Sequence, residues 1–290
     1  MSGNTICIVS RAVRIFGAAV VALLMSASVA DDDSLRVMSF NIRYGTANDG
    51  PDHWVARDQF VTDVIQTFDP DLLGTQETLG FQAQYLRNAL PHMAYVGSSR
   101  DRNPDGEQCG VLYRKDRFEQ LESGQFWLSE MPDEKFSQSW DSSLPRIACW
   151  VKLQDRSTGR RLLFVNTHFD HQGAVARRES AAVLRRFVEA QPTDLPVIVT
   201  GDFNCAEGSE PYRRLLSSVR LMDTFRSAYP EKQPLEGTFN GFRGTADGGR
   251  IDWILCAPDL KIRSAAIIRT DRNGRYPSDH FPVTAELIFP

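Results

Sequence analysis

Strand-length apolar runs and helix-like periodicities alternate along most of the chain. The apolar runs favour buried strands, while other segments place apolar residues at helical spacing with charged residues between them. The pattern predicts strands at Arg36–Asn41, Leu72–Thr75, Gly110–Arg114, Ala148–Leu153, Leu162–Asn166, Val197–Thr200, Ile251–Cys256, Ile262–Ile268 and Val283–Ile288. It predicts helices at Trp54–Phe68, Gly80–Leu90, Val175–Ala190 and Pro211–Val219.

The order of these segments indicates an α/β fold. Strands outnumber helices and some follow one another directly, so we expect two mainly antiparallel sheets that pack face to face, with helices outside. No linker, repeat or low-complexity tract divides residues 31–290, which we expect to form a single catalytic domain. The longest irregular stretches should be surface loops, where functional sites tend to lie: Arg100–Gln108, Ser129–Leu144 and Tyr229–Arg250.

The first thirty residues have the pattern of a secretory signal peptide. Arg11 and Arg14 precede an apolar stretch, Ile15–Val29, and small residues lead to Ala30 before an acidic run. The stretch is shorter than the roughly 20 apolar residues that span a bilayer. We therefore expect cleavage after Ala30, a periplasmic or secreted protein, and no stable membrane insertion of the mature chain.

Composition narrows the function classes. With 42% hydrophobic and 24% charged residues, the chain is neither disordered, collagen-like nor a coiled coil. Its 33 Lys and Arg against 37 Asp and Glu give a formal net charge of −4. Because binding to duplex DNA without sequence preference needs a strongly basic surface, a phosphate-bearing substrate must be held by local contacts.

Four cysteines remain after removal of the signal segment: Cys109, Cys149, Cys205 and Cys256. An even number in an oxidising compartment permits disulfides. Three of them, however, lie within or beside apolar runs, and no C-x-x-C spacing is present. We expect free, mostly buried thiols.

Polar residues with potential chemistry gather where the predicted strands begin or end. Taken singly, a strand-end Asn or Asp is often only a turn former, and a lone His is more often structural. Six strand termini with acceptor or imidazole groups are more than a structural account requires. The residues are Asn41, Glu77, His168, Asp202, Asn204, Asp252, Asp279 and His280. Oxygen donors without a Cys cluster suit Mg²⁺ or Mn²⁺, with Ca²⁺ as a third candidate, better than Zn²⁺.

These motifs, in this order, resemble those of the endonuclease/exonuclease/phosphatase superfamily over nearly the whole of residues 31–290. They are Phe-Asn, Gln-Glu, Asn-Thr-His, Gly-Asp-Phe-Asn, Arg-Ile-Asp and Ser-Asp-His-Phe-Pro-Val. The opening Phe-Asn-Ile-Arg-Tyr-Gly and the Asn-Thr-His-Phe-Asp-His segment look most like a secreted bacterial branch near the carbon catabolite repressor deadenylases. The resemblance implies a four-layered α/β sandwich with the site at one edge of both sheets.

The resemblance also implies roles for the residues. Glu77 is the expected metal ligand, with Asn41 beside it as a ligand or phosphate contact and Asp279 as a further candidate ligand. Asp202 is expected to orient or deprotonate the attacking water, and Asn204 to hold that aspartate or the phosphate. Residues two apart on an extended segment point to the same side, which fits this pair.

His168 and His280 are expected to donate hydrogen bonds to the phosphate. Asp279 could fix the tautomer of either imidazole or serve the metal, and Asp252 should support Asp202 or His168. Arg146 resembles a phosphate-contacting arginine of deoxyribonuclease-like members, although a surface Arg at a strand start is nearly as good an interpretation. Asn240, in the Phe239–Gly244 loop, is a further candidate for substrate binding.

The resulting hypothesis is divalent-metal-dependent hydrolysis of phosphate esters. We rank phosphodiesters, either small molecules or exposed single-stranded nucleic acid, first. The alternatives are a phosphomonoesterase on sugar or inositol phosphates, a calcineurin-like metallophosphoesterase, and a non-catalytic module that binds phosphate ligands. The missing Gly-Asn-His motif argues against the calcineurin-like class, and a binding module does not need a water-activating aspartate. No protein partner is implied.

Overall fold

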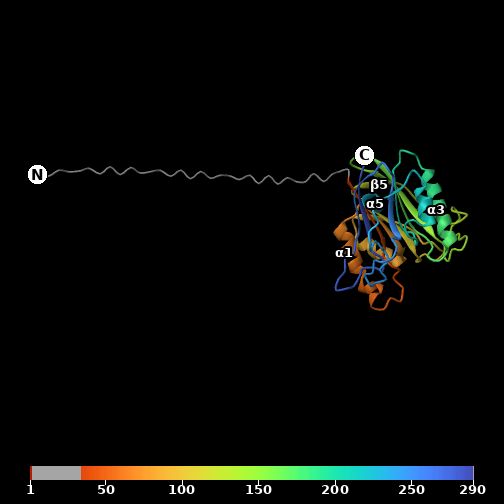
Figure 1. Cartoon of the computed structure of the whole chain (residues 1–290), viewed down its shortest axis with the longest axis horizontal. Coiled ribbons are helices and arrows are strands. Elements are labelled where there is room, and N and C mark those ends of the chain that lie inside the picture. The colour runs from red at the N-terminus through yellow and green to blue at the C-terminus, as the bar shows by residue number, and fades with distance from the viewer. Residues whose placement is uncertain (2–33, 290) are drawn as a thin grey trace. The chain divides into compact units, whose positions relative to one another are not determined.

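The computed structural model describes Met1 and residues 34–289, so the expected signal segment lies outside the described residues. Residues 34–289 form two six-stranded sheets (Figure 1). The first has the order β11 (Lys261–Ile267), β12 (Val283–Ile288), β1 (Ser34–Asn41), β2 (Leu72–Thr78), β4 (Gln108–Arg114), β3 (Met93–Val96). The second has the order β5 (Phe118–Trp127), β6 (Ile147–Asp155), β7 (Arg161–His168), β8 (Val197–Asp202), β10 (Asp252–Cys256), β9 (Met222–Asp223).

Both sheets are mainly antiparallel, as predicted. The parallel pairs are β1 with β2 in the first sheet and β7 with β8 in the second. Each parallel pair is joined through a helix, because a parallel connection must cross from one end of the sheet to the other. The carboxyl ends of these four strands consequently carry the expected site residues.

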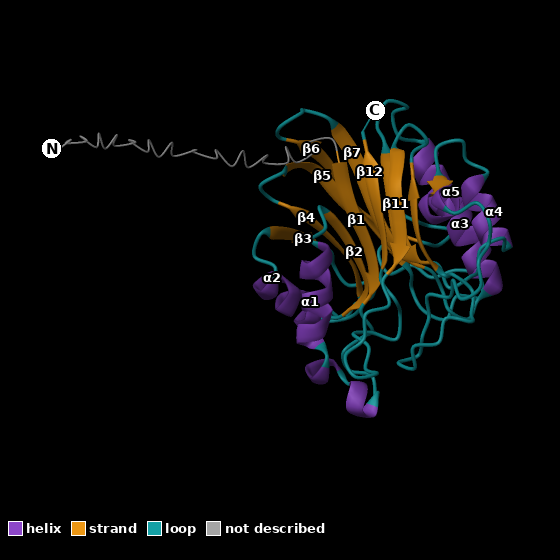
Figure 2. Ribbon diagram, turned by 60° about the vertical axis from the view of Figure 1, so that its left-hand side comes forward, coloured by secondary structure: helices purple, strands orange, loops and turns teal. Residues whose placement is uncertain are grey.

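Helices cover the outer faces of the sheets and complete four layers (Figure 2). On the first sheet α1 (Asp58–Phe68) and α2 (Gly80–Ala89) bury apolar residues with those of β1 and β2. On the second, α3 (Ala174–Glu189) and α4 (Glu210–Leu216) pack with those of β7 and β8. A short α5 (Thr224–Ala228) precedes the loop to β10. The four-layered α/β sandwich is confirmed.

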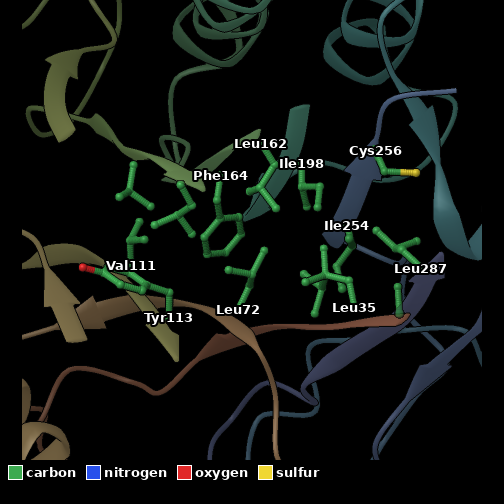
Figure 3. Close-up of a cluster of buried hydrophobic side chains, with 14 of the residues drawn as sticks. Leu35, Leu72, Val111, Tyr113, Leu162, Phe164, Ile198, Ile254, Cys256 and Leu287 are labelled. Carbon is green, nitrogen blue, oxygen red and sulfur yellow. The ribbon is translucent and has the colours of Figure 1, made fainter. Parts of the chain in front are cut away.

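The main core lies between the two sheets. Leu72 and Val111 of the first sheet and Leu162 and Phe164 of the second belong to one cluster of buried side chains (Figure 3). These residues are 0% exposed. Apolar side chains on both inner faces hold the sheets together, so the polar groups at the strand ends are placed by a rigid support.

A buried polar bridge joins the sheets within this interior. Asn166 of β7 donates from Nδ2 to the carbonyl oxygens of Thr75 and Gly110, at 2.8 Å each. Its Oδ1 accepts from Gln76 Nε2 at 2.6 Å and from Thr200 Oγ1 at 3.1 Å. All four hydrogen-bonding positions of one amide are thus used, which fixes β2 and β4 against β7 and β8.

All nine predicted strands are present, with ends that differ by a few residues. The range Trp54–Phe68 is not one helix: a 3-10 turn, Trp54–Ala56, precedes α1. The break occurs at Arg57, whose buried guanidinium donates to the carbonyl oxygens of Ile42 and Pro277. The last predicted helix ends at Leu216, before the expected Val219. Strands β3, β5 and β9 and helix α5 were not predicted.

The described residues bear out the expectation for the cysteines. Cys109, Cys149 and Cys256 are buried and free, and Cys205 is free and partly exposed. Burial raises the pKa of all four thiols, so they are poor nucleophiles. Among residues 34–289, no helix is long and apolar enough to cross a membrane.

Candidate active site

The expected site residues from both sheets meet at one edge of the sandwich. Strand pairing already places three of them together: Asp202 on β8 lies opposite His168 on β7 and opposite Asp252 on β10. Asn41 ends β1, and Glu77 lies near the end of the neighbouring strand β2. Register therefore brings residues that are far apart in the sequence into one group.

Asn41 connects the two sheets at this edge. Its Nδ2 donates to Glu77 Oε1 and to Asp202 Oδ2, at 3.0 Å each. Its Oδ1 accepts from the backbone N–H of Arg43 at 3.0 Å. Asn41 thus presents its amide nitrogen to both carboxylates and sets their separation.

Glu77 is aimed at Asn41 by an unusual backbone conformation. Its φ is 57°, in the left-handed region that side chains other than glycine rarely adopt. Here the pairing of β2 with β4 shifts register between Thr75 and Thr78. Its other oxygen, Oε2, accepts from the backbone N–H of Tyr44 at 3.0 Å. Strain of this kind persists where the surroundings fix it, and it often marks a functional position.

His168 and Asn204 form a pair beside Asp202. Asn204 Nδ2 donates to His168 Nε2 at 2.9 Å, so this imidazole nitrogen carries a lone pair. His168 Nε2 is also 3.4 Å from Asp202 Oδ2. Burial and the charge of Arg146 lower the pKa of His168 well below its ordinary value. Because Nε2 of His168 accepts from Asn204 in this arrangement, it does not present a proton for phosphate, which the sequence led us to expect.

His280 has the opposite protonation. Its Nδ1 lies 2.9 Å from Asp252 Oδ2, and its Nε2 lies 3.7 Å from Asp202 Oδ2. Burial by itself would lower the pKa of His280, but the charges of Asp252 and Asp202 raise it well above the ordinary value. His280 is therefore a cation that holds an Nε2 proton. Asp252, expected beside Asp202 or His168, is the carboxylate that orients His280.

Asp202 is buried at the centre of this group. Its Oδ1 accepts from the backbone N–H of Asn204 at 2.9 Å. Burial and the charge of Asp252 raise the pKa of Asp202 to about 7. A carboxylate with such a pKa can accept a proton near neutral pH.

Two groups of side chains bring potential ligand atoms within 4.8 Å of one another: Glu77, His168 and Asp202, and Asp202, Asp252 and His280. The second group contains a cationic imidazole, which opposes a bound cation. The first offers two carboxylates, the oxygen donors that Mg²⁺ or Mn²⁺ prefers, while Nε2 of its imidazole already accepts from Asn204. Compared with the expected ligands, this group adds His168 and Asp202 to Glu77.

Asp279 lies at the cavity but outside both groups. Its Oδ2 is 3.5 Å from Arg43 Nη1, and its Oδ1 accepts from Ser278 Oγ at 3.2 Å. Burial and the charge of Glu77 raise its pKa. Of Asp279 and Asp252, whose places the sequence left open, it is Asp252 that contacts an imidazole.

Asn240, expected to bind substrate, makes its hydrogen bonds within the protein. It is 1% exposed, its Nδ2 donates to the Ser278 carbonyl and its Oδ1 accepts from the backbone N–H of Phe242. Its backbone N–H donates to the carbonyl of Asp279 at 2.7 Å. The structure thus shows Asn240 holding the segment that carries Asp279 and His280.

A cavity of about 760 Å³ lies over these groups. Besides the strand-end residues it is lined by Arg146, as expected, and by Arg100, Arg43 and His171, which the sequence did not single out for substrate binding. Arg146 Nε is 3.3 Å from Asp170 Oδ2, and its Nη2 is 2.8 Å from His171 Nδ1. The polar Asp170–His171 segment therefore positions Arg146.

The chain matches the model of the endonuclease/exonuclease/phosphatase family over residues 38–280. It belongs to this family. The family and the relatives below make the chain a phosphoester hydrolase.

Three relatives illustrate the range of this family. A mannosyl-6-phosphatase from Bacteroides thetaiotaomicron is 36% identical, with a TM-score of 0.81 over 88% of this chain and 100% of that one. Nocturnin from Xenopus laevis is 24% identical over 88% of this chain and 73% of its own length. The human nocturnin catalytic domain with bound sulfate, 21% identical, shares the fold, with a TM-score of 0.72 over 89% of this chain and 95% of that one. The similarity to nocturnins agrees with the expected placement near the carbon catabolite repressor deadenylases.

Proposed function

We propose that the chain is a divalent-metal-dependent hydrolase of small phosphate esters, with sugar phosphomonoesters as favoured substrates. The observation that carries the proposal is the arrangement around Asp202. Its carboxylate and that of Glu77 form an oxygen donor set for a hard cation, and the cationic His280 lies 3.7 Å from Asp202 Oδ2. Hydrolysis of a phosphate ester needs charge neutralisation, an oriented water and hydrogen-bond donors for the phosphoryl oxygens.

Each residue has a separate role in this reaction. Asp202, oriented by Asn41 and by the backbone of Asn204, accepts a proton from the attacking water as the water oxygen bonds to phosphorus and the P–O ester bond breaks. His280, oriented by Asp252, keeps its Nε2 proton for a phosphoryl oxygen. When bound, the metal polarises the phosphoryl oxygen and offsets its charge. Glu77 would hold it, within reach of the Asp202 carboxylate.

Two observations favour small monoesters over the diesters that the sequence ranked first. The cavity volume of about 760 Å³ is that of a site for one small molecule. The relative that is 36% identical is a mannosyl-6-phosphatase, and the match covers 100% of that relative. A sugar phosphate also agrees with the negative net charge, which gives no extended surface for a nucleic acid.

Phosphodiesters with a base remain the second candidate because of Phe239. This residue is 49% exposed, lines the cavity, and packs edge to face on His280 with ring centroids 5.2 Å apart. An exposed ring at a phosphate site can stack on a nucleobase. The non-catalytic alternative has little support. A site that only binds phosphate does not need a buried carboxylate such as Asp202, whose raised pKa suits it to accept a proton from water.

A substrate panel tests the proposal. Initial rates are measured with Mg²⁺ or Mn²⁺ on mannose 6-phosphate, a dinucleotide, poly(A) and duplex plasmid, across a salt series. We expect the sugar phosphate to be hydrolysed fastest. Faster cleavage of the dinucleotide or poly(A) would favour the second candidate, and fast plasmid nicking with a steep salt dependence would place the enzyme with the deoxyribonuclease-like members.

Export is a separate proposal that rests on residues 1–30 alone. We propose cleavage after Ala30 because small residues end the apolar stretch there. Intact-mass analysis of the protein from an envelope fraction should show a chain that begins at Asp31. A full-length chain in the membrane pellet would instead support an anchor.

A further inference from the structure

Two buried arginines lie together at the catalytic cavity. Arg100, from the loop before β4, is 7% exposed, and Arg146, directly before β6, is 4% exposed. Arg100 donates from both terminal nitrogens to Glu107, at 2.9 and 2.8 Å. Arg146 contacts Asp170 and His171. Both arginines line the cavity together with Glu77 and His168.

Each arginine keeps a buried nitrogen without a partner. Among the described residues, no hydrogen-bond partner is present for Nε of Arg100 or Nη1 of Arg146. A buried guanidinium in a purely structural role is expected to have its N–H groups satisfied, since each unpaired one costs free energy. Nε of Arg36, Arg185 and Arg250 is unpaired as well, but none of these residues lines the cavity. It is the position of Arg100 and Arg146 together at the cavity that points to a ligand with negatively charged oxygens.

The electrostatics agree with this interpretation. Burial and the neighbouring charge of Arg100 lower the pKa of Arg146. Each guanidinium is paired with one carboxylate, Arg100 with Glu107 and Arg146 with Asp170, and an oxyanion between the two would add a further partner for both.

A small recess shows which oxygens fit. It has a volume of about 10 Å³. Five of its lining residues also line the main cavity (Glu77, Arg100, Glu107, Arg146 and His168), and Gln108, Cys109 and Ile147 close it. That volume is close to the smallest that holds a single water molecule. It accepts one terminal oxygen but leaves no room for the carbon of a second ester group.

We propose that Arg100 and Arg146 bind a terminal oxygen of the scissile phosphoryl group in this recess, so that the enzyme selects phosphomonoesters over phosphodiesters. The inference rests on the proposed function. A monoester has close to two negative charges at neutral pH and three terminal oxygens, whereas a diester has one charge and two such oxygens. Arg100 is thereby a specificity-determining residue supplied by a loop.

The test compares two substrates with the same leaving group, p-nitrophenyl phosphate and bis-p-nitrophenyl phosphate, both with Mg²⁺. We expect the wild type to prefer the monoester. In Arg100→Gln, kcat/KM for the monoester should fall by roughly ten- to hundredfold, while that for the diester changes little, because one charge-assisted hydrogen bond is lost only with the former. Arg100→Lys should recover part of the preference.

Arg102→Gln is the matched control. Arg102 is exposed in the same loop, lies over the ring of Phe136 and does not line the cavity. Its substitution should change neither rate. The melting temperature of each variant shows whether it folds.

A second measurement needs no variant. Inorganic phosphate and methyl phosphate should inhibit the wild type competitively, and dimethyl phosphate should inhibit at least about tenfold more weakly. Equal losses on both substrates in Arg100→Gln, or equal inhibition by the three phosphates, would overturn the proposal for Arg100 while leaving hydrolysis intact. No hydrolysis of either substrate by the metal-loaded wild type would instead contradict the proposed function.

Discussion

The residues that line the catalytic cavity come from two kinds of structure. Glu77, His168 and Asp202 lie at the ends of strands, whereas Arg100 and Arg146 lie in a loop and at a loop end. We call these the strand-end set and the loop set. The strand-end set is held by side-chain bonds across both sheets, with Asn41 at its centre. The loop set keeps unpaired N–H groups.

The difference suggests that the strand-end set carries out the reaction and the loop set selects the substrate. A group that must hold a metal and activate water needs fixed distances, and the rigid strand ends supply them. A group that chooses between substrates can lie in loops, which vary without disturbing the core. Changes in the strand-end set should therefore abolish hydrolysis of every substrate, while changes in the loop set should alter which substrate is preferred.

The largest effect should come from Asp202→Asn. We expect turnover on monoester and diester alike to fall by about 10²–10⁴, which is typical for loss of a general base. The stability of the fold should not decrease. The folded-state pKa of Asp202 is raised to about 7, so this group costs stability as the pH rises from its unfolded value towards 7, and the cost is complete above it.

The melting temperature checks this assignment. In EDTA at pH 8, Asp202→Asn should melt no lower than the wild type, because the variant has no buried charge at this position. If Asp202→Asn lost its activity because it unfolded, the result would show that Asp202 has a structural role.

A smaller effect is expected from Asp252→Asn, seen as a shift of the pH profile. The charge of Asp252 raises the pKa of both His280 and Asp202. Without it, both limbs of the kcat/KM profile should move to lower pH, by about one unit or more for a lost partner charge at this range. His280 would lose its proton at a lower pH, and Asp202 would become available as a base at a lower pH.

Profiles of kcat/KM against pH for the wild type and Asp252→Asn measure the shift. Asp259→Asn, an exposed change outside the cavity lining, is the control and should leave both limbs in place. A lower rate with unmoved limbs would show that Asp252 does not tune His280.

The smallest effect should be that of salt. In the proposed mode of binding, the loop set and His280 are the side chains that contact the phosphate. We therefore expect log(kcat/KM) to fall with log of the salt concentration with a slope of roughly −1 to −2, far from the steep slopes of proteins that neutralise many phosphates. The slope for Arg100→Gln should be shallower still. A wild-type slope of about −5 or steeper would mean that an extended charged surface binds the substrate.

Most of the fold could be predicted because the pattern follows burial. Strands that are buried along most of their length, such as β2, β4 and β8, were predicted. Strand β5 was missed because its middle is polar and exposed, from Glu119 to Ser123. It lies at a sheet edge and pairs only with β6, and polar residues protect such an edge from pairing with another chain. Strands β3 and β9 have four and two residues, too few for a pattern.

The site residues could also be predicted where the hydrophobic pattern marks them. Glu77 and Asp202 stand where an apolar run stops, and that interruption is visible in the sequence. The pairing of Asp252 with His280 was not predicted, because it depends on how two segments 28 residues apart meet. Arg100 gave no signal, since an Arg in a polar loop is the pattern of a solvated surface residue; only its burial in the folded chain distinguishes it.

Metal binding by the strand-end set is the central claim, and titration calorimetry tests it most directly. Protein dialysed against EDTA and then freed of chelator is titrated with Mn²⁺ or Mg²⁺, as wild type and as Glu77→Gln. The variant keeps the shape of the side chain and removes one negative ligand, so we expect saturable binding in the wild type and at least about tenfold weaker binding in Glu77→Gln, with an unchanged melting temperature in EDTA. Equal affinity in the two proteins would contradict the account.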